Sequence, residues 1–348
     1  MSSKNKKMQD VLDKAIDNRK IFGTSFCIQH NGDNWSGESG NLEPNCQYYI
    51  ASTTKLFITA VILNLDSKGI INLEDKIHQY FDPGYLNGLL NKNGKDFSRE
   101  ISIKNLLAHT SGIPDYFQQK NHGHESFESR IKKGQDRFWS FGDVIEYNKT
   151  LKPIFLPGAK GKAHYSDTNY QLLGRIIENI TGKTISELIQ ELILEPLALY
   201  NTYLYHDITD RKPVNFYYKD KELSIPKAMV SFVPDGGMVS TSKEMMVFIV
   251  ALFRGILCPI SYIDRIKVWN PLFYPPQAGI GIQRFKLPWI FNPAGSVPEL
   301  VGHSGLSGAL AFYCPERNLF IAGTVNQVAY PDTSYRLAIK LIQTCLHS

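Results

Sequence analysis

The sequence is poor in cysteine, and its cysteines follow no recognisable pairing pattern. Five cysteines stand among 348 residues, and none belongs to a Cys-x-x-Cys pair. A chain of this length can bury enough apolar surface to fold without covalent cross-links. We therefore expect free, buried thiols rather than a disulfide framework.

The sequence also lacks any dense run of basic residues. Its 38 Lys and Arg against 33 Asp and Glu give a formal net charge of +5, which is a weak field over this length. Proteins that bind nucleic acid usually concentrate lysine and arginine in one segment or on one face. We expect no nucleic-acid partner.

No apolar run is long enough to cross a membrane. The longest, Leu56 to Leu65, is interrupted by Thr59 and Asn64, whereas a spanning helix needs about 20 apolar residues. No apolar block follows the basic N-terminal residues, so no secretion signal is visible. We expect no stable membrane insertion and, for the chain as it stands, a cytoplasmic location; a leader ahead of these residues would instead mark an exported protein.

The sequence does have ordinary globular composition, with 43% apolar and 20% charged residues. Apolar periodicity predicts a fold with strands near both chain ends and helices between them. The predicted helices cover residues 8–19, 52–66, 170–179, 186–194, 243–253 and about 333–346, and the predicted strands cover 24–30, a segment near Trp35, 308–313 and 319–326. We predict an α+β fold in which strands from both ends form one antiparallel sheet with flanking helices and a mostly helical inserted region.

One short segment has residues that commonly bind metal. His122 and His124 flank Gly123 and precede Glu125, but the segment is polar and lacks a matched third ligand. A solvated loop is the better interpretation. We expect no metal and no cofactor.

The segment Ser52-Thr53-Thr54-Lys55 carries the first candidate chemistry. It opens an apolar helix, where residues three apart lie on one face. The positive end of the helix dipole and nearby backbone N–H groups suit a developing oxyanion. A partly desolvated lysine can take a proton from the serine hydroxyl. By itself the pattern is short, and a helix-capping serine beside a surface lysine is then the better interpretation.

Two further segments stand in order after it, namely Tyr165-Ser166-Asp167 and His303-Ser304-Gly305. With these three motifs the sequence resembles the serine β-lactamase and penicillin-binding-protein family. It is most similar to the branch of class C β-lactamases, D-Ala-D-Ala carboxypeptidases and related esterases. Residues 106–113 and 235–238 also resemble segments of this family. The resemblance runs from about Gly23 to the C-terminus.

The resemblance implies a role for each motif residue. Ser52 is the nucleophile that forms an acyl-enzyme, and Lys55 and Tyr165 form its general acid/base pair. His303 stands where many relatives have lysine, keeping the site electropositive or helping to move a proton. The resemblance gives substrate-binding roles to Asp167, His303, Ser304, Gly305 and Leu306, with the N–H groups of Ser52 and Leu306 as the oxyanion hole. Gly305 would leave room for substrate along a strand edge.

Several positions have alternative interpretations. Tyr165 could be a core tyrosine with its hydroxyl bound to backbone, and His303 could cap a loop, although the surrounding motifs favour the functional roles. His109, inside His-Thr-Ser-Gly, is interpreted as structural and stays outside the catalytic set. Asp167 replaces the asparagine of antibiotic-processing relatives, and an ionised carboxylate accepts hydrogen bonds but cannot donate them. Asp167 either points away from Lys55 towards substrate, which we favour, or pairs with Lys55 and leaves Tyr165 as the working base.

The resemblance implies a single β-lactamase/transpeptidase-like catalytic unit over residues 1–348. Residues 1–50 and 226–348 would form the sheet region and 51–225 the helical region, with the active site between them. The predicted function is serine hydrolysis of a small ester, amide or β-lactam through an acyl-enzyme. A β-lactamase, a D-Ala-D-Ala carboxypeptidase, a D-amino-acid peptidase or acyltransferase, and a silent binding module remain alternatives. The oligomeric state stays open.

Overall fold

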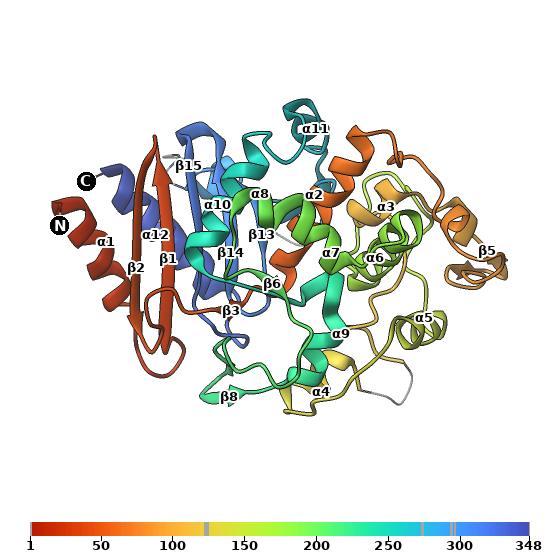
Figure 1. The fold of residues 1–348 in the computed structure, drawn as a ribbon, viewed down its shortest axis with the longest axis horizontal. Helices are drawn as coiled ribbons and strands as arrows, with labels where there is room; N and C mark the ends of the chain where they lie inside the picture. Colours follow the sequence, from red (N-terminus) through yellow and green to blue (C-terminus); the bar gives the residue numbers. More distant parts are fainter. Residues whose placement is uncertain (1, 122–124, 273–274, 293–294, 296, 348) are drawn as a thin grey trace.

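The fold of the computed structural model is built around one large antiparallel sheet (Figure 1). The structure describes residues 2–121, 125–272, 275–292, 295 and 297–347. In this part of the chain the large sheet has eight strands in the order β10-β11-β12-β13-β14-β15-β1-β2. They are β1 (Gly23–His30), β2 (Asp33–Gly40), β10 (Asn270–Pro271), β11 (Pro276–Ala278), β12 (Gln283–Phe285), β13 (Leu300–Ser304), β14 (Ala309–Cys314) and β15 (Leu319–Thr324).

The sheet joins the two ends of the chain. Strand β1 pairs with β15 so that Cys27 lies opposite Ala322. The terminal helices α1 (Ser3–Asp13) and α12 (Asp332–His347) pack on each other beside this pairing, and Figure 1 shows both termini there. The prediction of a sheet formed from both chain ends with flanking helices is confirmed.

Both faces of the sheet are covered, which explains the continuous apolar strands. Side chains alternate between faces along a strand. Phe26 of β1 lies in the core under α1 and α12, and the next residue, Cys27, lies in the core on the opposite face. That opposite core is filled by α2 (Thr54–Ser67) and α10 (Ser242–Phe253), where the rings of Phe57 and Phe248 stack at 3.6 Å.

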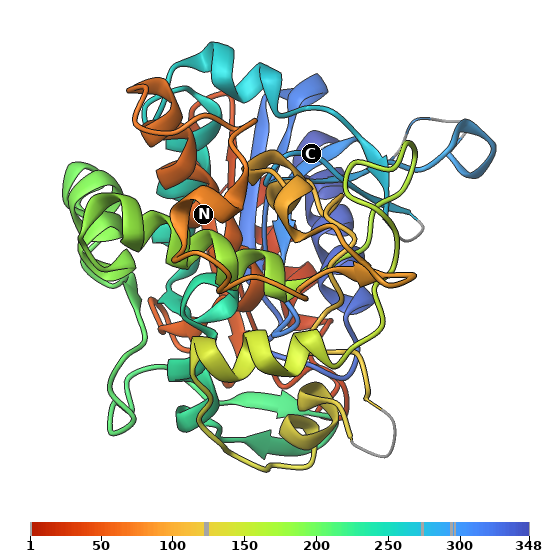
Figure 2. The ribbon, with the colours of Figure 1, turned by 90° about the vertical axis from the view of Figure 1, so that its right-hand side faces the viewer.

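The helical region packs beside this second core (Figures 1 and 2). Its helices are α3 (Ile103–Leu107), α4 (Phe127–Lys132), α5 (Phe141–Lys149), α6 (Asp167–Thr181), α7 (Ile185–Ile189), α8 (Glu195–Leu197), α9 (Pro226–Gly236) and α11 (Ile260–Arg265), with a π-helical turn at Gln190–Leu194. Short 3₁₀ turns are Ala51–Thr53, Ile77–Tyr80, Ser98–Glu100, Trp289–Phe291 and Pro315–Arg317.

Three small sheets complete the described fold. One has the order β3-β9-β6, and the others are the hairpins β4–β5 and β7–β8. Their strands are β3 (Tyr48–Tyr49), β4 (Asn91–Lys92), β5 (Lys95–Asp96), β6 (Tyr203–Leu204), β7 (Phe216–Tyr218), β8 (Lys221–Leu223) and β9 (Met238–Ser240). Strand β3 lies directly before the Ser52 segment in the sequence. Its pairing with β9 brings residue 49 beside residue 239. The predicted division at residues 50 and 225 stays a prediction.

The first helix differs from its predicted bounds of 8–19. It begins at Ser3, because the Ser2 side chain accepts the Asn5 N–H, and it ends at Asp13. Beyond it the Asp17 carboxylate accepts the backbone N–H groups of residues 19, 20 and 21. An aspartate that satisfies backbone donors in this way favours a turn over further helix. Among the described residues, no helix combines the length and apolarity that a membrane crossing requires.

Candidate active site

Ser52 is presented by a strained turn at the start of α2. The residue before it, Ala51, has φ +46°, a left-handed conformation that alanine rarely adopts. Gly305 packs against the same turn, since a Cβ added there would lie 2.4 Å from the Ile50 carbonyl oxygen. The backbone before Ser52 therefore needs a glycine at this position, and the predicted room for substrate stays a prediction.

Lys55 places its amine at the centre of the site. Nζ donates to Ser52 Oγ at 3.0 Å and to the Asp235 backbone oxygen at 2.5 Å. It also forms an ion pair with Asp167 Oδ1 at 2.6 Å, and the lysine side chain is fully buried. Two hydrogen bonds and one ion pair therefore surround the ammonium group. Burial of this charge is tolerated because it is paired with a carboxylate and hydrogen-bonded.

The position of Asp167 corrects the interpretation we favoured from the sequence. We expected its carboxylate to point away from Lys55, and that expectation is wrong, because the two side chains are in direct contact. Asp167 is the first residue of α6, and its backbone N–H donates to Asp115 Oδ1 at 2.9 Å. Asp167 also lines the pocket beside Ser52. Its predicted contact with substrate stays a prediction.

Tyr165 lies over the same amine. Lys55 Nζ is 5.3 Å from the centre of its ring. Burial, and then the negative charge of Asp167, raise the pKa of the phenol well above its usual value, while a hydrogen bond with Ser52 acts in the opposite direction. The phenol is therefore protonated at neutral pH and can donate a proton.

His109 supports Tyr165 from behind. The two rings stack with centroids 4.5 Å apart, and His109 Nδ1 accepts the backbone N–H of Ser166 at 3.2 Å. Burial and the nearby Lys55 charge hold the His109 pKa well below its usual range. A neutral, buried ring in this place fits the structural role predicted for it.

His303 and Ser304 end strand β13 next to the site. Burial first, and the Lys55 charge second, lower the pKa of His303 to about 3. A neutral ring at physiological pH argues against the electropositive role, and the other predicted role, movement of a proton, stays a prediction. Its Nδ1 lies 2.7 Å from the Ser304 carbonyl oxygen. Because a carbonyl only accepts, Nδ1 carries the proton and Nε2 is left as an acceptor.

The remaining predicted residues lie around the turn that follows β13. The Ser304 hydroxyl accepts a hydrogen bond from Tyr335 at 2.8 Å, which fixes it to α12. Leu306 lines the same pocket as Ser52. The structure therefore gathers the eight predicted residues around one centre, and their assigned roles stay predictions.

Sequence reasoning missed two buried carboxyl groups beside this centre. Asp115 and Asp235 are both about 1% exposed. Burial, followed by the Asp167 charge, raises the pKa of Asp115 to about 8 and that of Asp235 well above its usual value. Asp235 follows a kink in α9 at Val233, where φ is +20° and ψ is −84°. No periodicity indicates this kink, although residues 235–238 already stood out as similar to the family.

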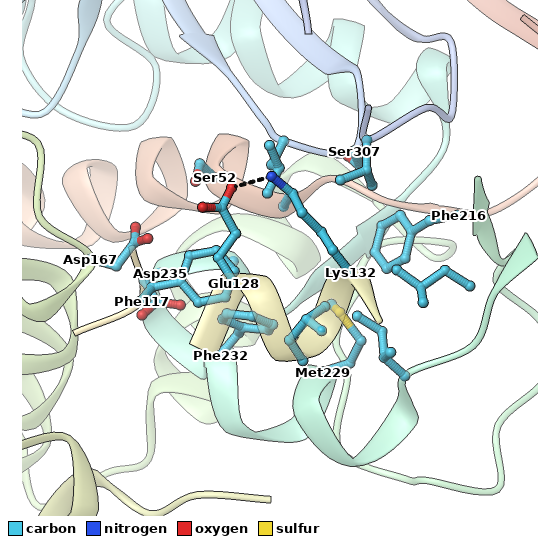
Figure 3. Close-up of a pocket in the computed structure, with 17 residues that line it drawn as sticks. Ser52, Phe117, Glu128, Lys132, Asp167, Phe216, Met229, Phe232, Asp235 and Ser307 are labelled. Carbon is cyan, nitrogen blue, oxygen red and sulfur yellow. Dashed lines mark hydrogen bonds and ion pairs between the residues drawn. The ribbon is translucent and has the colours of Figure 1, made fainter. Parts of the chain in front are cut away.

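An apolar pocket opens beside Ser52 (Figure 3). Its walls come from α4, the β7–β8 hairpin and α9, which Figures 1 and 2 show as neighbours. Glu128 and Lys132 of α4 also line it and form an ion pair of 2.8 Å. Figure 3 places Asp167 and Asp235 at one end of the pocket and Phe216 towards the other. The pocket thus has an acidic end and an apolar body.

No metal centre is apparent in the described part of the chain, where no group of three His, Cys, Asp or Glu side chains could hold an ion. His122, Gly123 and His124 lie outside the described residues. The cysteines at 27, 46, 258, 314 and 345 are free.

Comparison with known proteins places this geometry in a family. The beta-lactamase family pattern matches residues 8–343, nearly the whole chain. The chain belongs to the beta-lactamase family. N-acetylmuramyl-L-alanine amidase of Bacillus subtilis is 28% identical over 361 residues, which cover 92% of this chain and 76% of that protein. Protein flp of Staphylococcus aureus is 29% identical over 55% of this chain, but over only 36% of its own length.

Solved structures agree with this placement. The D-stereospecific amidohydrolase from Streptomyces sp. superposes with a TM-score of 0.75 at 25% identity, covering 93% of this chain and 95% of its own. The D-amino acid amidase from Ochrobactrum anthropi SV3, complexed with L-phenylalanine amide, gives 0.81 at 21% identity and 99% coverage of both chains. The latter likeness shows the fold alone. The predicted β-lactamase/transpeptidase-like fold is confirmed, and the chain is a hydrolase of that fold.

Proposed function

We propose that this protein is a serine amidohydrolase that cleaves small amides through an acyl-enzyme on Ser52. The observation that carries the proposal is the chain of contacts from Ser52 Oγ to Lys55 Nζ, 3.0 Å, and from Lys55 Nζ to Asp167 Oδ1, 2.6 Å. A weak nucleophile such as a serine hydroxyl needs a route for its proton, and these contacts supply one.

The proton of Ser52 moves along that chain as the bond to carbon forms. Lys55 takes the hydroxyl proton while it passes one of its own protons to Asp167, so Lys55 stays an ammonium and Asp167 becomes neutral. Ser52 Oγ attacks the substrate carbonyl carbon, and the N–H groups of Ser52 and Leu306 stabilise the resulting oxyanion. An amide in place of Asp167 has no lone pair basic enough for this step, so the departure from asparagine suits the proposal.

Collapse of the tetrahedral intermediate requires a proton on the leaving nitrogen. The protonated phenol of Tyr165 donates it. The phenolate then regains a proton from Lys55, and Lys55 regains one from Asp167. The net result is transfer of the serine proton to the leaving amine. Water hydrolyses the acyl-enzyme by the same steps in reverse order.

Support for amides as the substrate class comes from the relatives. Three similar proteins are named as amidases or amidohydrolases. A β-lactam and an activated ester contain the same reacting carbonyl, so they serve as contrasting substrates.

The test is to trap the covalent intermediate. The protein is mixed with an amino-acid amide panel, p-nitrophenyl acetate and nitrocefin, quenched in acid and analysed by intact-mass spectrometry. We expect a mass increase equal to the acyl group, located by peptide mapping on Ser52 and missing in Ser52→Ala. Catalysis with no covalent adduct under any quench, or an adduct on another residue, would refute the proposal. Nitrocefin turnover faster than that of every amide would identify a β-lactamase.

A further inference from the structure

The pocket beside Ser52 contains one carboxyl group without a counterion. Three acidic side chains line it, at positions 128, 167 and 235. Glu128 pairs with Lys132 at 2.8 Å, and Asp167 pairs with Lys55 at 2.6 Å. Among the described residues, the Asp235 carboxyl group forms no ion pair within 4.0 Å. Asp235 is therefore the acidic group that is available to a ligand.

One oxygen of Asp235 is held by the protein and the other is not. Oδ2 accepts hydrogen bonds from the Tyr116 hydroxyl and from Gln171 Nε2, each at 3.0 Å. Oδ1 is buried and has no hydrogen-bond partner among the described residues. Leaving a buried polar atom unsatisfied costs about 1–3 kcal/mol. An unsatisfied atom of this kind in a binding pocket calls for an explanation, and a ligand group that pairs with it supplies one.

The position of Asp235 relative to Ser52 indicates which part of a substrate it meets. Lys55 Nζ donates both to Ser52 Oγ and to the Asp235 backbone oxygen, so the two residues flank the same amine. Tyr165, which protonates the leaving group in the proposed reaction, lies outside the pocket lining. The leaving group therefore lies on the Tyr165 side, and the pocket receives the acyl group.

The rest of the pocket selects for apolar bulk. Phe117, Met229 and Phe232 form part of its wall together with Ile131 and Leu306. Apolar contact of this kind stabilises a buried side chain by about 25 cal/mol per Å² of apolar area. An acyl group that fits both ends carries a hydrogen-bond donor near its carbonyl carbon and an apolar side chain beyond it.

We propose that the acyl pocket binds α-amino acids that have a free ammonium group and a bulky apolar side chain, with Asp235 Oδ1 accepting a hydrogen bond from the ammonium. The proposal rests on the proposed function, because it names the substrate class of the same site. In addition to turnover, it concerns the binding of the intact substrate before any reaction.

The charges around the pocket predict that binding of such a ligand releases a proton. Asp235 is faced by the charges of Asp167 and Lys55, by the carboxyl group of Asp115 and by the Tyr116 hydroxyl. Burial first, and the Asp167 charge second, raise the pKa of Asp235 well above its usual range, which favours the protonated carboxyl group in the free protein. An ammonium beside it favours the carboxylate. Binding therefore releases a proton, and a neutral ligand of equal shape releases none.

The kinetic test compares two substrates that differ only in the amine. Phenylalaninamide, as each enantiomer, is compared with 3-phenylpropionamide at pH 7. We expect at least one enantiomer to exceed the des-amino compound in kcat/KM by about tenfold or more, the value of one charge-assisted hydrogen bond. Asp235→Asn keeps an acceptor for Tyr116 and Gln171 but turns an N–H₂ group to the ligand, and should abolish the preference. Equal kcat/KM values in the native protein would overturn the proposal.

Two other variants serve as controls for charge. Asp264→Asn removes an exposed carboxylate of α11 that pairs with Lys267 at 2.8 Å, far from the pocket lining. It should leave the preference intact. Glu128→Gln neutralises the other acidic group in the pocket. If Glu128→Gln rather than Asp235→Asn abolished the preference, Glu128 would be the ammonium receptor and the assignment to Asp235 would be wrong.

A binding measurement separates this proposal from the proposed function. Calorimetry with Ser52→Ala, in buffers of different ionisation enthalpy, measures affinity and proton release without turnover. We expect phenylalaninamide to bind with release of a proton and 3-phenylpropionamide to bind more weakly with none. Such binding without any Ser52 acylation in the native protein would leave the subsite standing and refute the serine mechanism. Equal binding of both compounds, or binding of neither, would refute the subsite.

Discussion

Lys55 and Asp167 form a buried ion pair, with Nζ and Oδ1 2.6 Å apart, directly behind the Ser52 hydroxyl. In the proposed reaction, this pair makes the second motif part of the proton route. It also explains how a fully buried lysine is held in place, because the desolvation of each charge is offset by the other.

Ser52→Ala and Lys55→Arg should each abolish acylation. Alanine removes the nucleophile, and arginine keeps the charge but cannot give up a proton. We expect losses of about 10⁴-fold or more in the acylation rate with p-nitrophenyl acetate, followed by stopped-flow absorbance. The double variant should be no worse than either single one, because the two residues act as a unit. Additive losses would show that Lys55 acts separately from Ser52.

Asp167→Asn should slow acylation without unfolding the protein. Asparagine can still accept a hydrogen bond from Lys55, but it cannot take a proton, so the relay ends at the lysine. The expected loss is about 10²–10⁴-fold in kcat, the usual range for general base catalysis. A matched variant, Asp264→Asn, loses a surface carboxylate and should retain full activity. A rate for Asp167→Asn equal to the native rate would mean that the proton leaves by another path.

Gly305→Ala should damage both stability and activity. The added Cβ would lie 2.4 Å from the Ile50 carbonyl oxygen and 3.2 Å from the Ser52 nitrogen, so the turn that presents Ser52 must move. We expect about 1–3 kcal/mol of destabilisation in urea unfolding. Gly142→Ala is the control, since the nearest atom there is 3.7 Å away. Native-like activity of Gly305→Ala would show that the turn tolerates displacement.

Stability should fall as the pH rises from about 6.5 towards 8. The folded-state pKa of Asp115 is raised from its usual 3.8 to about 8. A raised carboxyl pKa contributes stability that is present below the unfolded-state value and is lost as the pH rises through the folded-state value. Between these values one such group gives a slope of up to about 1.4 kcal/mol per pH unit. The lowered folded-state pKa values of His109, His164 and His303 act in the opposite direction, but only near and below the unfolded-state value of 6.5.

Asp115→Asn should make that slope smaller. Asp235, whose pKa is also raised, continues to contribute its own share. The measurement is the free energy of unfolding in urea at pH 6.5, 7.0, 7.5 and 8.0 for both proteins. An identical pH dependence for the native protein and the variant would show that Asp115 ionises in the folded state as it does in the unfolded chain.

The sequence by itself determined the motifs and the sheet. Ser52 and Lys55 are three residues apart at a helix start, so helical geometry alone brings them together. The apolar strands near both chain ends required partners and covered faces, which predicted their pairing in one sheet. These features depend on local periodicity and on the need to bury apolar surface, and both can be read along the chain.

Only the tertiary structure decided the environment of the amine. Lys55 meets Asp235 across 180 positions of sequence, through a kink in α9 that no local pattern indicates. The Asp167 side chain points towards Lys55, because the buried ammonium group of Lys55 is the opposite charge that lies next to it. The neutrality of His303 follows from burial under neighbouring elements. Ion pairing and desolvation depend on distances between elements that are far apart in sequence, so packing of the whole chain was needed to set them.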